Sequence, residues 1–569
     1  MGTETRKKGI AIGVEDFKRI IENGAYFVDK TLLIRDLIQS EAQTTLFTRP
    51  RRFGKTLNQI MLKCFFEDER TDSGEKIDNG HLFDGLEVSK CGQEIMQHQQ
   101  QYPVIFISLK SAKQPDFEMA YNCLADEIYK EFGRHRYVLN SDALEPEERE
   151  QFQNLVRRKA SKEELAKSFA ILSMGLYKYH GKKTIILIDE YDVPLENAYT
   201  RGFYDQMVDF IRSFFESALK TNMYLEKAVI TGCLRISKES IFTGLNNLEI
   251  HSITSPLYGS YFGFTEPEVQ EMLAYYGFSS KYPEIKKWYD GYLFGDTEIY
   301  NPWSILNYVR MAQGDINYLP RAYWSNTSSN SIVHELVKDA DDETREELEI
   351  LMNGGGIEKP VREEITYADI HTSKNNLWNF LFLTGYLKKS GENMDEDGNR
   401  IMKMSIPNTE IKTIYRDSIS HWFDEKLKKV DCGVLTRALE NEDCEVAEDF
   451  ISQQLMDTIS YYDYAENYYH AFLVGLLIGG GGYRIASNRE SGNGRPDIVM
   501  YTQNIRKGRV IILEVKTATS VADLEPACDK GLAQIEEQHY AEPYETEGYP
   551  NIKKYAIAFY KKECMVKAE

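Results

Sequence analysis

The sequence predicts an α/β fold, with a parallel sheet in the first part of the chain, a mainly helical middle part and a smaller α/β part at the C-terminal end. Short apolar runs that do not alternate with polar residues, at 104–107 and 185–188, are typical of strands covered on both faces. Longer amphipathic stretches, such as residues 163–180, separate these runs and indicate helices that cover the sheet.

The length of the chain and changes in its pattern predict several domains. A chain of 569 residues is too long for one hydrophobic core, so two or three domains are expected. The pattern changes near residue 255 and again between 425 and 435, which suggests domains at 1–255, 256–430 and 431–569. Hydrophobic residues at 42% and charged residues at 28% indicate ordinary globular domains.

The net charge and the cysteines argue against several classes of protein. A formal charge of −21 argues against a general basic surface for nucleic acid, so such contact would need local basic patches or a metal ion. None of the eight cysteines forms a C-x-x-C pair, so neither a zinc ribbon nor a disulfide framework is indicated. No secretory signal is visible, and no run approaches the roughly 20 apolar residues of a membrane helix. A soluble, cytoplasmic protein without a membrane partner is expected.

A phosphate-binding loop is predicted after the first strand, residues 44–48. Residues 49–56, with the sequence RPRRFGKT, lead into a helix with one apolar face. Free backbone N–H groups at a helix start attract phosphate. The candidate nucleotide-binding residues of this loop are Arg52, Phe53, Gly54, Lys55 and Thr56. Lys55 would reach the terminal phosphates, and the Thr56 hydroxyl would hold Mg²⁺.

Further candidate residues follow two later strands. The strand 184–188 ends at Asp189 and Glu190; Asp189 would bind Mg²⁺ and Glu190 would orient or deprotonate the attacking water. The alternative is an acidic turn after a buried strand. Thr231 ends the strand 228–231, where a polar side chain could sense the γ-phosphate of ATP, and Arg235 is either an arginine finger or sensor or a structural arginine.

The middle part offers no chemistry that its residues support. Aromatic-rich segments at 288–294 and 376–387 predict helices, and residues 391–399 predict a hairpin or surface turn. The aromatic side chains are expected to form a core, although the region could also form a lid over the nucleotide.

A metal site is predicted near the C-terminal end. Asp497 begins one strand, and Glu514 and Lys516 share one face of the next, because side chains alternate along a strand. Asp497 and Glu514 would hold Mg²⁺ or Mn²⁺ through oxygen atoms, and Lys516 would position a water or stabilise negative charge. A chance Glu-x-Lys pair on an exposed strand is the alternative, which the apolar residues on both faces up to Glu514 disfavour.

Two more side chains are candidates for this site. Glu466 lies one turn before Tyr469 on the apolar face of the helix predicted at 465–480, and a carboxylate there is costly unless it is paired or bound to a metal. Glu466 could therefore complete the metal shell, or it stays hydrated near the helix start. Gln534, on the helix after the strands, is a candidate contact for water or phosphate.

The motifs in combination resemble two known families. YFVDKT (26–31), RPRRFGKT (49–56), LIDEYD (187–192) and GLNNL (244–248) resemble the AAA-ATPase-like family, and residues 288–304 are similar to the segment after its ATPase core. RPD (495–497) and EVK (514–516) resemble the PD-(D/E)xK nuclease family. RESGNGRPD (489–497), which includes Glu490 and Arg495, looks like the subgroup fused to AAA-ATPase-like modules.

These resemblances imply more than the residues do by themselves. They imply a P-loop NTPase fold for 1–255 and a nuclease-like fold for 431–569, with Arg495 gripping a phosphate. The loop of the family also carries Arg at position 49, where the general P-loop has Gly, so ATP binding is better supported than ATP turnover.

The leading hypothesis is an ATP-binding, ATP-hydrolysing protein whose metal-dependent nuclease domain cleaves DNA or RNA under nucleotide control, with ATP and Mg²⁺ or Mn²⁺ as cofactors. Alternatives are an ATP-switched nucleic-acid-binding or signalling protein with an inactive nuclease fold, and an ATP-driven motor whose last domain only grips DNA. Self-association into a homo-oligomer stays open.

Overall fold

The computed structural model describes residues 7–220, 222–235, 241–242, 248–324, 331–338, 340–363, 365–396, 398–427, 430–456, 466–487 and 494–569. The chain divides into two compact units. Unit 1 comprises Met1–Ser329 and Gly356–Lys412, and unit 2 comprises Asn330–Gly355 and Thr413–Glu569. The domain boundaries expected at 255 and 430 stay predictions.

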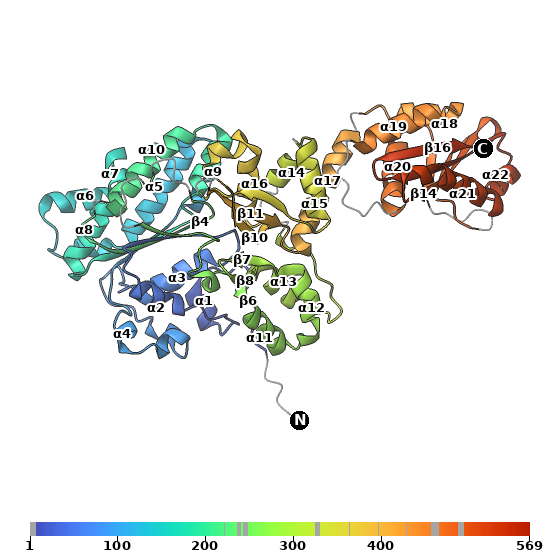
Figure 1. Ribbon diagram of the computed structural model, residues 1–569. Helices are drawn as coiled ribbons and strands as arrows, with labels where there is room; N and C mark the ends of the chain where they lie inside the picture. The colour runs from blue at the N-terminus through green and yellow to red at the C-terminus, as the bar shows by residue number, and fades with distance from the viewer. Residues whose placement is uncertain are drawn as a thin grey trace, which may run out of the picture. The chain divides into compact units, whose positions relative to one another are not determined.

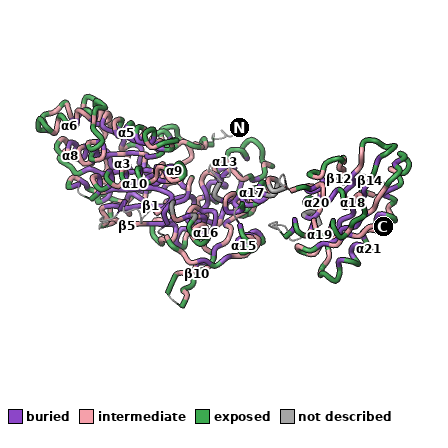
Figure 2. The backbone as a smooth tube through the Cα atoms, turned by 90° about the horizontal axis from the view of Figure 1, so that it is seen from above, coloured by how far each residue is buried: buried purple, intermediate pink, exposed green. Residues whose placement is uncertain are grey.

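Unit 1 is built around a parallel five-stranded sheet, which confirms the predicted α/β fold. The strand order is β2-β3-β4-β1-β5. Its members are β1 (Thr44–Thr48), β2 (Val104–Ser108), β3 (Thr184–Asp189), β4 (Leu225–Gly232) and β5 (Leu248–His251). Every residue of β1 and β3 is buried, as the unbroken apolar runs indicate. Figure 2 shows such buried segments in purple.

Helices cover both faces of this sheet (Figure 1). One face carries α1 (Phe17–Glu22), α2 (Leu32–Gln39), α3 (Lys55–Phe66) and α4 (Gln93–Met96). The other carries α5 (Phe117–Arg134), α6 (Pro146–Val156), α7 (Lys162–Ala166), α8 (Ser168–His180), α9 (Val193–Arg201) and α10 (Tyr204–Phe215). The sheet is therefore the middle layer of three, and the loops at the carboxyl ends of its strands are free to form a site.

The middle part of the sequence is mainly helical, as predicted, and adds two small sheets to unit 1. The helices are α11 (Glu266–Tyr276), α12 (Tyr282–Tyr289), α13 (Pro302–Ala312) and α16 (Lys374–Leu383). The sheets are β6-β8-β7 (Phe264–Thr265, Thr297–Tyr300, Tyr292–Phe294) and β10-β11-β9 (Lys388–Met394, Arg400–Ser405, Ile357–Pro360). The antiparallel pair β10 and β11 confirms the hairpin predicted at 391–399.

One helical prediction in this part is wrong, and the helix expected at 376–387 ends earlier, because α16 stops at Leu383. Residues 292–294 were expected to continue a helix, but α12 ends at Tyr289 and these residues form β7. Gly291 explains the break, because it has a φ of 100° and a side chain there would meet the carbonyl oxygen of Pro407. The apolar and aromatic side chains of α11, α12 and α13 pack together as a core, in line with the expected use of the aromatics.

Unit 2 contains a mixed five-stranded sheet with helices on both faces. The strand order is β12-β13-β14-β15-β16, in which only β14 and β15 run parallel. The strands are β12 (Arg484–Ser487), β13 (Ile498–Tyr501), β14 (Arg509–Thr517), β15 (Asn551–Tyr560) and β16 (Glu563–Ala568). The helices are α14 (Ser331–Lys338), α15 (Asp342–Met352), α17 (Thr409–Leu427, begun in unit 1), α18 (Gly433–Asn441), α19 (Cys444–Met456), α20 (Glu466–Gly480), α21 (Leu524–Glu537) and α22 (Glu542–Glu547).

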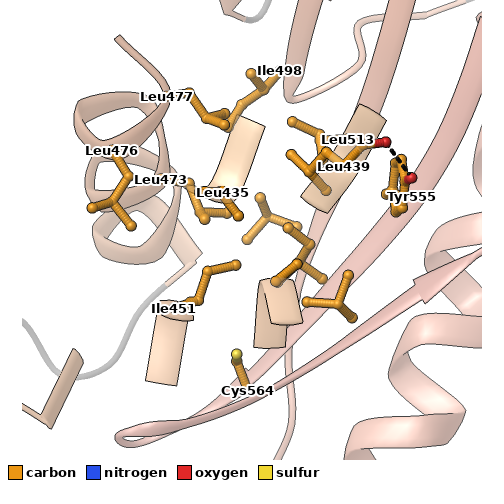
Figure 3. Close-up of a cluster of buried hydrophobic side chains, with 14 of the residues drawn as sticks. Leu435, Leu439, Ile451, Leu473, Leu476, Leu477, Ile498, Leu513, Tyr555 and Cys564 are labelled. Atoms are coloured by element: carbon orange, nitrogen blue, oxygen red, sulfur yellow. Dashed lines mark hydrogen bonds between the residues drawn. The ribbon is translucent and has the colours of Figure 1, made fainter. Parts of the chain in front are cut away.

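The central strand β14 is buried on both faces. Ile511, Leu513 and Val515 pack against α18, α19 and α20 in the cluster that Figure 3 shows in part. In that view the Tyr555 hydroxyl donates a hydrogen bond of 2.6 Å to the Leu439 carbonyl, which ties the sheet to α18. Val510 and Ile512 face the opposite side, against α21. The strand that carries the predicted metal ligand Glu514, together with Lys516, is therefore held rigidly.

Within the described ranges, no helix is both long and apolar enough to cross a membrane.

A buried carboxyl group, Glu410, ties together distant segments of unit 1. Its oxygens accept hydrogen bonds from the Ser304 hydroxyl, at 2.8 and 3.0 Å, and from the Trp324 backbone N–H, at 2.8 Å. The side chain is fully buried, and this burial raises the pKa of Glu410 to about 7. The protonated form is therefore favoured in the folded state relative to the unfolded chain.

The pH dependence of unit 1 stability is expected to reveal this group. Because the pKa of Glu410 is raised from 4.5 to about 7 on folding, its contribution is fully present below pH 4.5 and is lost as the pH rises through 7. Glu410→Gln should remove a fall of about 3 kcal/mol in the free energy of unfolding across this window. Urea unfolding followed by tryptophan fluorescence measures it, since four of the five tryptophans lie in unit 1: Trp288, Trp303, Trp324 and Trp378.

Glu147→Gln is the matched control, because Glu147 is exposed on α6. Parallel pH profiles for the wild type and Glu410→Gln would contradict the assignment.

Candidate functional site

The predicted phosphate-binding loop lies between β1 and α3. Gly54 precedes the first residue of α3 with a φ of 85°, and Arg52 has a φ of 72°, so the loop turns sharply through left-handed backbone conformations. Because β4 lies between β1 and β3, the carboxyl ends of these three strands meet at one edge of the sheet. The loop, Asp189 and Thr231 are therefore neighbours.

Asp189 is the centre of this arrangement. Its two carboxylate oxygens accept hydrogen bonds from the Thr56 hydroxyl, at 2.8 Å, and from the Thr231 hydroxyl, at 2.6 Å. Burial and the neighbouring Glu190 raise the pKa of Asp189 to about 6, against the opposing effect of these hydrogen bonds. The structure thus brings together three of the residues that the sequence predicts for Mg²⁺ and phosphate contacts.

Lys55 lies beside these residues and is almost completely buried. Its ammonium group donates to the carbonyl oxygens of Arg49 and Pro50, at 3.1 and 3.2 Å, and lies 3.6 Å from a Glu190 carboxylate oxygen. Glu190 reaches this position through a left-handed φ of 53°, which is strained for a residue with a side chain. Such a buried ammonium at a helix start suits an anionic phosphate ligand.

Arg52 and Phe53 point their side chains elsewhere. The Arg52 guanidinium lies 4.4 Å from the centre of the Trp303 ring. Phe53 is fully buried and packs against the rings of Tyr292 and Phe294, with centroids 5.0 and 5.1 Å apart. Any phosphate contact from these two residues would therefore use backbone N–H groups, while their side chains fasten the loop to the middle part of the sequence.

Arg49 has a structural role at the position where the general P-loop has glycine. Its guanidinium is fully buried, lies 5.1 Å from the ring centres of Phe262 and Phe294, and donates to the carbonyl oxygens of Thr48 and His251. Burial lowers the pKa of Arg49 to about 9. Arg49 thus fixes the start of the loop to β5 and the aromatic side chains that follow it.

A buried carboxylate that the sequence interpretation did not assign, Asp192, stabilises the turn after β4. One of its oxygens accepts hydrogen bonds from the backbone N–H groups of Cys233 and Leu234, at 2.8 and 3.0 Å, and lies 3.4 Å from the Tyr367 hydroxyl. The only sequence signal is its place in LIDEYD. Arg235 follows this turn and is half-buried, while residues 236–240 and 244–247 lie outside the described residues.

The predicted metal ligands in unit 2 also converge. Asp497 precedes β13, whose residue Ile498 pairs with Leu513 of β14, so Asp497 lies beside Glu514 on the neighbouring strand. An Asp497 oxygen accepts the backbone N–H of Val515 at 2.8 Å. The Lys516 ammonium lies 2.9 Å from one oxygen of Glu514.

The environment of Glu514 is suited to a bound cation. Its side chain is 2% exposed, and its second oxygen is buried without a hydrogen-bond partner in the part of the chain that the structure describes. Burial, with the neighbouring Asp497 carboxylate second, raises the pKa of Glu514 to about 7. A buried oxygen that accepts no hydrogen bond of normal geometry from the described residues, next to a second carboxylate, matches the all-oxygen ligand set of Mg²⁺ or Mn²⁺.

The other residues predicted for this site have different positions. The Gln534 amide donates to the Tyr540 hydroxyl at 3.3 Å, and that hydroxyl donates to the Arg495 carbonyl at 3.3 Å, so Gln534 supports the segment before Asp497. The Arg495 side chain is exposed. Glu466 begins α20, but its side chain lies outside the described residues, as does Glu490.

The sequence interpretation did not identify His470, which also holds Asp497 in place. Its Nε2 lies 2.9 Å from the Asp497 carbonyl oxygen and 3.0 Å from the Ser487 hydroxyl. Because a carbonyl oxygen only accepts, Nε2 must carry the proton. The spacing of four residues between Glu466 and His470, which puts both on one helix face, is the sequence signal that could have identified it.

Comparisons with known proteins match the two ends of the chain to two families. Residues 11–242 match the family described as "Predicted AAA-ATPase". Residues 464–569 match the "PD-(D/E)XK nuclease superfamily". The chain is 24% identical over 563 residues, which is 96% of this chain and 95% of the relative, to an "Uncharacterized protein in vnfD 5'region" of Azotobacter chroococcum mcd 1. The predicted pair of family domains is therefore confirmed.

Replacing Asp497 by Asn is expected to stabilise the metal-free protein. Asn can still accept the Val515 N–H, while the substitution removes a negative charge beside the buried Glu514. The free energy of unfolding of unit 2 in a chelator should rise by about 1 kcal/mol. Added Mg²⁺ should stabilise only the wild type, by about 2.7 kcal/mol at a concentration a hundred times the dissociation constant. Calorimetry of the full chain with EDTA or Mg²⁺ measures both effects.

Asp529→Asn, a change of an exposed carboxylate on α21, is the control and should alter neither quantity beyond a few tenths of a kcal/mol. Equal stabilisation of the wild type and Asp497→Asn by Mg²⁺ would rule out this pair as a cation site.

Proposed function

We propose that this chain, which joins an AAA-ATPase-like domain to a C-terminal PD-(D/E)XK nuclease superfamily domain, binds and hydrolyses ATP and cleaves DNA or RNA phosphodiesters with a divalent metal, under the control of its nucleotide state. The main observation behind the proposal is that Asp497, Glu514 and Lys516 converge around a buried carboxylate oxygen of Glu514, which has no hydrogen-bond partner among the described residues.

The nuclease chemistry follows from the positions of these three side chains. Asp497 and Glu514 would hold Mg²⁺ or Mn²⁺, which when bound lowers the pKa of a water and offsets charge on the phosphodiester. Lys516 would hold its ammonium charge against the negative charge that develops during cleavage. His470 and the pair of Gln534 and Tyr540 support the backbone that carries Asp497, so the first carboxylate stays in position.

The nucleotide site would work by exchange of partners. Lys55, now held by two loop carbonyls and close to Glu190, would turn its charge to the terminal phosphates of ATP. Thr56 and Asp189 would then hold the Mg²⁺ that accompanies ATP, with Thr231 fixing the Asp189 carboxylate. Glu190, released from Lys55, would orient the attacking water or accept its proton.

Contacts of the phosphate loop favour control by nucleotide state. The loop touches the middle part through Arg52 on Trp303 and through Phe53 on Phe294, and a side chain at Gly385 would meet the Pro50 ring at 3.1 Å. A shift of the loop on phosphate binding must therefore move these packed partners. The chain continues from the middle part through α17 into the nuclease-like unit. A movement caused by nucleotide binding could therefore be transmitted to unit 2 along the backbone.

A cleavage assay with the full chain tests the proposal. Labelled single- and double-stranded DNA and RNA are incubated with Mg²⁺ or Mn²⁺, with and without ATP. The wild type should cleave at least one of these substrates, and Asp497→Ala should lower the rate by about a hundredfold or more, the scale of removing a group that stabilises developing charge. Lys55→Ala should abolish the effect of ATP on cleavage, because the phosphates lose their buried cation.

Two exposed residues supply the controls, Glu525→Ala on α21 for the nuclease site and Lys110→Ala for the nucleotide site. If no substrate is cut while Lys55→Ala still abolishes ATP-dependent nucleic-acid binding, the protein is a nucleotide switch with an inactive nuclease fold. Equal cleavage by Asp497→Ala and the wild type would remove Asp497 from the mechanism.

A further inference from the structure

Two histidines and a glutamate gather in unit 2, on helices that carry none of the residues proposed for the nucleotide and nuclease sites. His334 lies on α14, whereas His421 and Glu425 lie one turn apart on α17. One imidazole nitrogen of each histidine and one carboxylate oxygen of Glu425 all lie within 4.8 Å of one another. Three potential ligand groups from two helices therefore face one point.

The three side chains of this cluster lie close together but do not form hydrogen bonds with one another. Nε2 of His334 lies 3.8 Å from one oxygen of Glu425, and Nδ1 of His421 lies 4.0 Å from the other oxygen. Both separations exceed a hydrogen bond. The two imidazole rings lie 5.0 Å apart and are inclined by 74°, so they do not stack on each other.

We propose that His334, His421 and Glu425 bind a zinc-class transition-metal ion, Zn²⁺ in the first place. Two imidazole nitrogens and a carboxylate suit Zn²⁺, whereas Mg²⁺ prefers oxygen ligands. This site is thus chemically distinct from the pair of Asp497 and Glu514. Three protein ligands leave one position of a tetrahedral ion for water, which the partial exposure of the cluster permits.

Small side-chain rotations complete the site. Ligand atoms around a tetrahedral zinc ion lie about 3.4 Å apart, given metal–ligand bonds of about 2.0–2.1 Å. The observed 3.8 and 4.0 Å are measured to different oxygens of Glu425, and a set with one ligand atom from each residue lies within 4.8 Å. The separations therefore need to shorten by at most about 1.4 Å. The side chains of His334, His421 and Glu425 are 30%, 64% and 46% exposed, which leaves them room for this adjustment.

The ion would link the segment Asn330–Gly355 to the rest of unit 2. Asn330–Gly355, which contains α14 and α15, belongs to this unit although residues 356–412 lie between it and the rest of the unit in the sequence. Other links along this piece include the ion pair of Glu349 with Lys562, at 3.1 Å, and the guanidinium of Arg345, 6.0 Å from the Trp422 ring. A metal bridge between α14 and α17 would close this long loop and stabilise the folded arrangement.

Metal titration of the full chain tests the proposal. Untagged protein carrying Asp497→Ala, so that the carboxylate pair does not compete, is stripped with a chelator and titrated with Zn²⁺ in a calorimeter. One equivalent should bind with a dissociation constant of micromolar or below, and His421→Ala or His334→Ala should weaken it at least about tenfold. Co²⁺ should give the visible absorption of a four-coordinate nitrogen and oxygen site in the parent and not in either variant.

His539→Ala is the matched control, because His539 is 52% exposed and lies 3.1 Å from Glu542 on α22, away from this cluster. It should keep the full equivalent of Zn²⁺. Circular dichroism in chelator should be the same for all proteins, which separates loss of the ligand from loss of the fold. The proposal is overturned if the parent binds no Zn²⁺ at micromolar concentration, or if both histidine variants bind it as tightly as the parent.

Discussion

The close approach of two carboxylates on neighbouring strands is the constraint on which the nuclease-like unit depends. Asp497 and Glu514 are fixed side by side by the pairing of β13 with β14, and one Glu514 oxygen is buried without a donor in the described residues. Such an arrangement costs free energy in the absence of a cation, because burial and like charge both oppose ionisation. The apolar packing on both faces of β14 supplies the stability that offsets this cost, so the fold maintains a site that a divalent ion would relieve.

Unit 1 also has a buried charged group that a ligand could stabilise, but here the buried group is a cation. Lys55 is a buried cation whose present contacts are loop carbonyls and the nearby Glu190 carboxylate, an arrangement that phosphate oxygens could replace. The loop around it is held from behind by Arg49 and Phe53, which pack among aromatic side chains rather than facing the site. A site that responds to nucleotide needs an ion pair that can be exchanged for phosphate and a loop that is packed against its neighbours. Movement of such a loop on phosphate binding displaces the packed side chains, whereas a loose loop would move alone.

Sequence patterns predicted the parts of this structure that depend on local order along the chain. The strand at 44–48, the meeting of Thr56, Asp189 and Thr231, and the shared face of Glu514 and Lys516 all follow from strand periodicity and from the loops that end parallel strands. The burial of Arg49 was not predictable in this way, because Phe262 and Phe294 reach it only through the tertiary fold. Asp192 was missed for the same reason, since it binds backbone groups of a distant segment, whereas the spacing of His470 from Glu466 was a signal that was not used.

The central claim is that the pair of Asp497 and Glu514 holds a divalent cation, and Mn²⁺ binding followed by electron paramagnetic resonance tests it most directly. Titration of the ATP-free full chain should show one more equivalent of tightly bound Mn²⁺ in the wild type than in Asp497→Ala, because the variant keeps only one of the two carboxylates. Identical numbers and affinities of bound Mn²⁺ in the two proteins would contradict the account and leave the buried Glu514 without an explanation.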